Sequence, residues 1–207
     1  MRGRGGPVGA LLLAPGAGSD RNQSTLVAIE AAVAPLPVAR VDFPYRKEGR
    51  RAPDRAPTLL ASLTDDARAF VAETHIRSRR LALGGRSMGG RVASMAVADG
   101  LPAAALVLVA YPLHPPGQHE RLRVGHLGDI EVPCLFVAGT RDPFGTPEEL
   151  LAATSTIAGP VTHHWVQGGR HELKGADPEV AAVVAAWLSA RPLRAAAPAP
   201  QRGRPRG

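Results

Sequence analysis

The sequence predicts a single α/β domain built on one mainly parallel β-sheet of about six strands, with helices on both faces. Short apolar runs alternate strictly along the chain with longer stretches of helical pattern, which is typical of α/β proteins. Several of the runs are almost wholly apolar, as expected for strands covered on both faces. At 207 residues the chain is long enough to bury the core of one compact domain. The expected strands are residues 8–13, 38–43, 81–83, 105–110, 134–138 and 161–166.

Helices are expected between these runs, over residues 23–34, 58–76, 88–99, 147–157 and 178–190. Thr146 precedes Pro147 and Glu149, a combination that predicts an N-cap, a proline in the first turn and an acid near the helix start. Asp177 before Pro178 predicts a second N-cap. Two stretches rich in proline, glycine or arginine, 44–57 and 111–128, are expected to be irregular, and no segment is long enough for a large lid.

The net charge of +7 lies wholly at the two ends of the chain. Two arginines in residues 1–6 and five in residues 191–207 account for it, so residues 7–190 are formally neutral. We therefore predict a basic N-terminal tail (1–6), a folded domain (7–190) and a disordered tail (191–207). A neutral domain gives no reason to expect a specific nucleic-acid partner.

Cysteine content and hydropathy favour a cytoplasmic protein. Cys134 is the single cysteine and cannot form an internal disulfide, which favours a reducing compartment. No apolar run approaches the roughly 18 residues of a membrane span. Arg2 and Arg4 ahead of residues 8–14 imitate a signal peptide, but cleavage there would remove the first expected strand.

The motif with the clearest chemical content is Gly85-Arg86-Ser87-Met88-Gly89. It matches G-x-S-x-G, in which a serine stands on a strained turn between a strand and a helix and serves as a nucleophile. The preceding apolar run and the helical pattern from Arg91 onward supply that context. The motif therefore predicts Ser87 as a catalytic nucleophile.

A serine nucleophile needs a histidine base and an acid that orients it, and in this class of fold both follow the serine in the order acid, then histidine. Asp142 comes after the expected strand 134–138, and His171 comes after the expected strand 161–166. Taken alone, Asp142 could be a turn or capping aspartate and His171 a loop histidine. Their order and positions predict a Ser87, Asp142, His171 triad.

An oxyanion hole requires two backbone N–H groups directed at the developing negative charge. Met88, directly after the nucleophile, is expected to supply one, and Ala17 in the glycine-rich segment after the first strand the other. A strand order of 2-1-3-4-5-6 would place the first and third strands side by side and bring the two donors together. A phosphate-binding loop is the alternative, but the segment lacks the Walker lysine and the GxGxxG spacing.

The other histidines do not predict metal catalysis. His163 and His164 are adjacent in a strand and should point to opposite faces, and His171-Glu172 lacks a second histidine at zinc-protease spacing. No metal or cofactor is expected. Tyr111 and His114, which follow the fourth strand, are expected to contribute to the wall of the substrate pocket.

Six segments resemble the small α/β-hydrolases of the dienelactone hydrolase-like group, in the lineage of testis-expressed protein 30 and KAT8 regulatory NSL complex subunit 3. The segments are residues 11–20, 43–57, 84–94, 111–117, 139–150 and 168–174. The resemblance implies an α/β-hydrolase fold, the same triad, and oxyanion donors at Ala17 and Met88. Pro15 stands where the family often has histidine, and Arg170 where it often has aspartate.

The function expected from these features is serine-dependent hydrolysis of a small ester, thioester or similar acyl compound through an acyl-enzyme. The alternative is a non-catalytic interaction module, because some relatives are subunits of complexes. Retention of all three triad residues in order favours the enzyme. The oligomeric state is not predicted.

Overall fold

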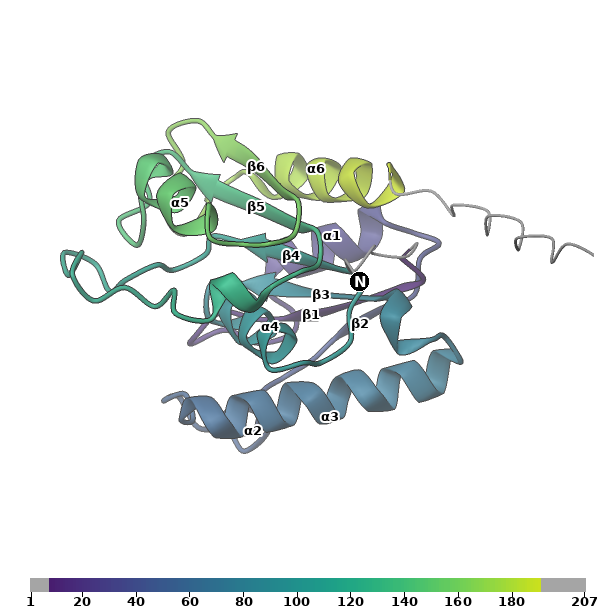
Figure 1. The fold of residues 1–207 in the computed structure, drawn as a ribbon. Helices are drawn as coiled ribbons and strands as arrows, with labels where there is room; N and C mark the ends of the chain where they lie inside the picture. Colours follow the sequence, from purple (N-terminus) through teal and green to yellow (C-terminus); the bar gives the residue numbers. More distant parts are fainter. Residues whose placement is uncertain (1–7, 191–207) are drawn as a thin grey trace, which may run out of the picture.

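The computed structural model describes residues 8–190, and both predicted tails lie outside them. Its six strands form one fully parallel sheet in the order β2-β1-β3-β4-β5-β6, as predicted (Figure 1). The strands are β1 (Ala10–Ala14), β2 (Val38–Arg40), β3 (Leu81–Arg86), β4 (Ala105–Val109), β5 (Cys134–Gly139) and β6 (Val161–Val166).

Helices cover both faces of the sheet (Figure 1). The helices are α1 (Ser24–Ala32), α2 (Pro44–Lys47), α3 (Ala56–Thr74), α4 (Met88–Ala98), α5 (Pro147–Thr154) and α6 (Asp177–Ser189), with 3-10 turns at Ser78–Arg80 and Leu127–Asp129. Alternate strand residues enter opposite halves of the core: Leu12 packs on the side of α3, α4 and α5, whereas Leu11 and Leu13 pack on the side of α1 and α6. This two-sided burial explains why the strand sequences are almost wholly apolar.

Most element boundaries shift by one to three residues from the prediction; among the strands, the second, predicted over 38–43, ends at Arg40. Two differences concern the extent of the third strand and the structure of residues 44–57. The third strand continues through Gly84 and Gly85 to Arg86, because these residues pair in register with Val107–Val109 of β4. Two consecutive glycines carry no strand signal in a sequence. Residues 44–57, predicted as irregular, contain the short helix α2, which begins at Pro44.

The two predicted N-caps have different outcomes. Thr146 forms a capping box with Glu149, as expected. The prediction for Asp177 is wrong, because Asp177 is the first residue of α6 and Ala176 holds the N-cap position. The Asp177 carboxylate instead accepts a hydrogen bond of 2.5 Å from the hydroxyl of Thr25, and thereby ties α6 to α1.

Within residues 8–190, no helix combines the length and the apolar character needed to cross a membrane.

Candidate active site

Ser87 stands on a strained turn between β3 and α4. Its backbone has φ 51° and ψ −116°, in a region that non-glycine residues rarely adopt and that costs of order 1–3 kcal/mol. The turn also presses on the end of β1, because a Cβ at Gly85 or Gly89 would lie 2.2 Å from the carbonyl oxygen of Ala14. Glycines are therefore required on both sides of the serine, which is the physical basis of the G-x-S-x-G motif.

The structure brings Ser87, His171 and Asp142 into one hydrogen-bonded line. Ser87 Oγ lies 2.8 Å from His171 Nε2. On the other side of the ring, His171 Nδ1 lies 2.8 Å from Asp142 Oδ2 and 3.0 Å from Oδ1. An ionised carboxylate can only accept, so Nδ1 carries the proton and Nε2 offers its lone pair to the serine hydroxyl. This arrangement suits transfer of the serine proton to the histidine.

The three side chains differ in their exposure to solvent. The Asp142 side chain is 1% exposed and that of His171 is 11% exposed, whereas Ser87 is partly exposed. The carboxylate is thus shielded from water while the hydroxyl remains reachable. A shielded acid interacts more strongly with the imidazolium that forms during proton transfer.

The loops that carry the acid and the base are joined to each other. A Cβ at Gly139 would lie 2.2 Å from the carbonyl oxygen of Gly169, so these backbones are in close contact. Arg141 N–H donates to Gly169 at 2.8 Å, and Gly168 N–H donates to the hydroxyl of Thr140 at 2.8 Å. These contacts fix the distance between Asp142 and His171.

Two residues that sequence reasoning missed hold the triad in place. The Phe144 ring lies against the His171 ring at 4.0 Å between centroids, and its N–H donates to Asp142 Oδ1 at 2.8 Å. Asp142 thus also accepts a hydrogen bond within its own turn, the structural role that was the alternative for this residue. Arg86 Nη2 donates to the carbonyl oxygen of His171 at 2.8 Å. Arg86 occupies a variable position of the motif, and its role was not visible from residue type.

Two segments near Ser87 carry the expected oxyanion donors. Met88 is the first residue of α4, where N–H groups have no partner within the helix and the helix dipole is positive. A Cβ at Gly16 would lie 3.5 Å from Ser87 Cβ, so the loop after β1 reaches the serine. Gly16 N–H is engaged by Gln23 Oε1 at 3.2 Å, and Ala17, the next residue, is exposed. Gln23, which the sequence did not single out, orders this loop.

The expectation that Tyr111 and His114 line the substrate pocket needs correction. Tyr111 is 2% exposed, and its hydroxyl contacts Ser94 Oγ at 3.1 Å and His126 Nε2 at 3.2 Å. His114 is 0% exposed and contacts Pro115 and Glu149. Both side chains are packed inside the protein, with their polar atoms engaged. A substrate would reach them only if this packing changed.

A second serine–histidine pair lies at the edge of the core, where Ser94 is fully buried and His126 is partly exposed. Ser94 Oγ is 2.8 Å from His126 Nε2 and donates to the carbonyl oxygen of Arg91 at 2.8 Å. Burial lowers the pKa of His126 to about 4, with the positive charge of Arg91 acting in the same direction. Burial also raises the pKa of Tyr111, which contacts both residues, to about 12. The network is neutral and stays so across the physiological range.

Two further pairs of histidines can be compared with the sequence prediction. His163 contacts Thr154 of α5 and His164 contacts Glu179 of α6, so the neighbours do point to opposite faces of the sheet. A group of His114, His119 and Glu149 also comes together, with nitrogen and oxygen atoms that could hold a metal ion. No local sequence pattern indicates this group, because Glu149 follows His119 by 30 residues.

Comparison with known proteins gives a family and a fold. The sequence matches a family model described as an alpha/beta hydrolase domain over residues 7–183. A solved alpha-beta serine hydrolase homologue from Coxiella burnetii is 19% identical, with a TM-score of 0.72 over 91% of this chain and 89% of that chain. A dienelactone hydrolase from Anabaena variabilis is 19% identical, with a TM-score of 0.69 over 89% and 87%. A type II thioesterase from the borrelidin biosynthetic cluster is 20% identical, with a TM-score of 0.64 over 87% and 93%.

Proposed function

The chain belongs to the α/β-hydrolase family, and from this premise we propose that it is a serine hydrolase of small esters or thioesters. The observation that carries the proposal is the unbroken line from Ser87 Oγ through His171 to the buried carboxylate of Asp142. Each member has the hydrogen-bonding role that nucleophilic catalysis requires. We propose Ser87 as nucleophile, His171 as general base and Asp142 as the acid that orients the ring.

Acylation begins when Ser87 Oγ attacks the carbonyl carbon of the substrate. The hydroxyl proton passes to His171 Nε2, and Asp142 stabilises the imidazolium that results. The carbonyl oxygen becomes an oxyanion, which accepts hydrogen bonds from the N–H groups of Met88 and Ala17. When the tetrahedral intermediate collapses, the bond to the leaving oxygen or sulfur breaks. The leaving group takes the proton from His171, and the acyl group remains on Ser87.

Deacylation repeats these steps with water in place of Ser87. His171 removes a proton from the water, which attacks the acyl-enzyme carbonyl, and the same two N–H groups bind the oxyanion. The second intermediate releases Ser87, which regains its proton from His171. One ester or thioester and one water thus give one carboxylic acid and one alcohol or thiol.

The proposal also includes a substrate class, a cellular location and a kind of partner. The proposed nucleophile and base lie in residues 84–94 and 168–174, two of the segments that resemble dienelactone hydrolase-like proteins. This resemblance supports an acyl substrate of modest size. Dienelactone hydrolase and thioesterase structures among the similar folds agree with this choice. A buried, single Cys134 supports a cytoplasmic location. We infer a small-molecule partner and no specific nucleic acid.

A substrate panel tests the proposed activity. The full-length protein is assayed with p-nitrophenyl esters and acyl thioesters of short and medium chain length. We expect turnover of at least one class, and loss of at least about 10³-fold in kcat for Ser87→Ala. Circular dichroism and Tm serve as controls for folding. A folded wild type that turns over no member of the panel would favour the interaction module instead.

A further inference from the structure

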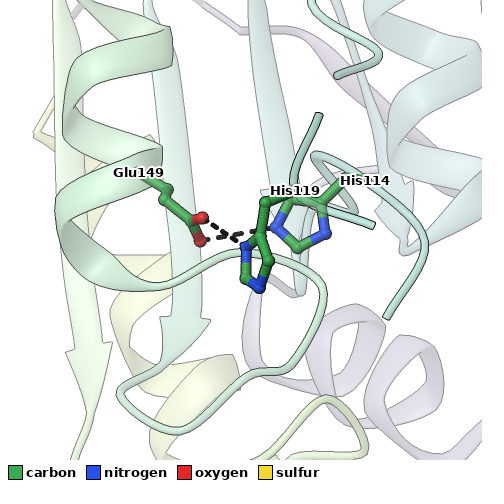
Figure 2. Close-up of side chains that lie close together, drawn as sticks. All are labelled: His114, His119 and Glu149. Atoms are coloured by element: carbon green, nitrogen blue, oxygen red, sulfur yellow. Dashed lines mark hydrogen bonds and ion pairs between the residues drawn. The ribbon is translucent and has the colours of Figure 1, made fainter. Parts of the chain in front are cut away.

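His114, His119 and Glu149 converge on one point outside the triad (Figure 2). His119 Nδ1 lies 2.7 Å from Glu149 Oε1, and His114 Nε2 lies 3.4 Å from Glu149 Oε2. All three potential ligand atoms lie within 4.8 Å of one another. The two histidines belong to the segment after β4, and the glutamate belongs to the first turn of α5. The group thus joins two segments that are distant in sequence.

The hydrogen bonds of His114 place Nε2 of its ring opposite the Glu149 carboxylate. His114 Nδ1 lies 2.8 Å from the carbonyl oxygen of Pro115, which can only accept, so Nδ1 carries a hydrogen. In the neutral ring Nε2 is then a lone pair, and it faces a carboxylate oxygen. Two acceptors face each other favourably only with a proton or a metal ion between them. The His114 side chain is 0% exposed, so an ion there would be held inside the protein on this side.

Glu149 is prepared to act as an anionic ligand. Its Oε2 accepts the N–H of Thr146 at 2.8 Å, and this bond is the main cause that lowers the pKa of Glu149 to about 2. The carboxylate is therefore ionised at neutral pH. Its Oε1 faces His119, whose side chain is 64% exposed and leaves the group accessible from solvent.

We propose that His114 Nε2, His119 Nδ1 and the Glu149 carboxylate bind a divalent transition-metal ion, with Zn²⁺ as the reference ion. Two imidazoles and one carboxylate suit Zn²⁺ and related ions rather than Mg²⁺ or Ca²⁺, which prefer oxygen ligands. Ligands of a tetrahedral Zn²⁺ lie about 3.3 Å apart. The 3.4 Å between His114 Nε2 and Glu149 Oε2 matches this spacing. His119 Nδ1 is at hydrogen-bond distance from Oε1, 2.7 Å, so the exposed His119 side chain would have to release that hydrogen and move outward by about half an ångström to bind the ion. The Nδ1–H bond from His114 to a backbone carbonyl is the arrangement that orients metal-binding histidines.

The metal would fix the segment after β4 against α5, next to the triad. The N–H groups of Leu113 and His114 donate to the carbonyl oxygen of Phe144 at 2.9 and 3.3 Å. Phe144 in turn packs on His171. The ion would therefore stabilise the segment that holds Phe144 against His171. The proposed serine chemistry takes no step through it, so either proposal can fail without the other.

Zinc binding is tested on the full-length, untagged protein after treatment with a chelator. Competition with a chromogenic zinc chelator should give one equivalent of tightly bound Zn²⁺, and the ion should raise Tm. Replacement by Co²⁺ should give the visible absorption of a tetrahedral site with nitrogen ligands. His119→Ala, which removes an exposed side chain, should weaken binding by at least about tenfold.

Two further variants make the test specific. Glu149→Gln should weaken Zn²⁺ binding while keeping the helix start intact, because glutamine also serves in a capping box. His164→Ala is the matched control, since His164 and Glu179 form a histidine–carboxylate pair at 2.8 Å without a second histidine. This control should bind as the wild type does. Absence of tight binding, or equal binding by the wild type and His119→Ala, would overturn the proposal.

Discussion

Two serine–histidine pairs lie along the same helix, and only one of them has the features of a catalytic pair. Ser87 and Ser94 both place Oγ 2.8 Å from a histidine Nε2. Ser87 precedes the first residue of α4, on a strained backbone, and is partly exposed. Ser94 is in the middle of the helix and fully buried, and its hydroxyl donates to the backbone carbonyl oxygen of Arg91.

The histidines differ as much as the serines. His171 has the carboxylate of Asp142 behind its ring, whereas Ser94 and Tyr111 are the hydrogen-bond partners of the His126 ring. A base must become positively charged when it removes a proton, and Asp142 supports that charge. Burial and Arg91 oppose it at His126, whose pKa is about 4. Because the two serine–histidine distances are equal, our assignment of Ser87 as the nucleophile rests on the acid, the exposure and the strained turn instead.

The largest effect is expected from the acid that distinguishes the two pairs. Asp142→Asn should lower kcat by about 10⁴-fold, because an amide can donate to Nδ1 and favour the wrong tautomer of His171. KM should change far less, since the substituted side chain is buried behind the ring. Steady-state kinetics on the best substrate of the ester and thioester panel measures both constants. Near wild-type kcat in a folded variant would remove Asp142 from the mechanism.

Truncation of the buried serine should affect stability instead of catalysis. Ser94→Ala removes one buried hydroxyl, while Tyr111 and His126 keep the contact of 3.2 Å between them. We expect the free energy of unfolding to fall by about 1 kcal/mol and kcat to stay within a few-fold of the wild type. Urea unfolding and the same kinetic assay provide the two numbers. A collapse of kcat without loss of stability would make Ser94 the catalytic serine.

A stability effect of similar size is the acid destabilisation assigned to His126. Its pKa is lower in the folded state, about 4, than the ordinary value of 6.5, so the unfolded state binds more protons between these values. Its stabilising contribution is present above pH 6.5 and is lost as the pH falls toward 4. We expect His126→Gln to reduce the difference in unfolding free energy between pH 7.5 and pH 4.5 by on the order of 1–2 kcal/mol. An unchanged difference would contradict the buried, neutral state of His126.

The sequence predicted those parts of the molecule that depend on local pattern. Apolar runs and helical periodicity predicted a parallel sheet of about six strands with helices on both faces. The strand order entered as the condition that brings the loop after β1 next to Ser87, and the structure has that order. The positions of Asp142 and His171 followed from the ends of β5 and β6. The parallel sheet and these two positions depend on the order of elements along the chain, which can be read from the sequence.

What the sequence did not predict depends on contacts between distant residues. Phe144 acts through its ring and backbone, Arg86 through a backbone carbonyl, and Gln23 through a loop N–H, so residue type gave no indication of their roles. Tyr111 was expected in a pocket because of its place after β4, but packing with Ser94 and Phe136 places it in the core. Packing between residues that are distant in sequence thus determines whether such a side chain lies in the core or lines a pocket.

Covalent labelling measures the difference between the two serines most directly. The full-length wild type is treated with a fluorophosphonate probe, and the modified peptide is identified by mass spectrometry. We expect modification at Ser87 and none at Ser94. Labelling should be lost completely in Ser87→Ala and retained in Ser94→Ala. Labelling that persists in a folded Ser87→Ala variant, or a folded wild type that is never labelled, would contradict the assignment of Ser87 as the nucleophile.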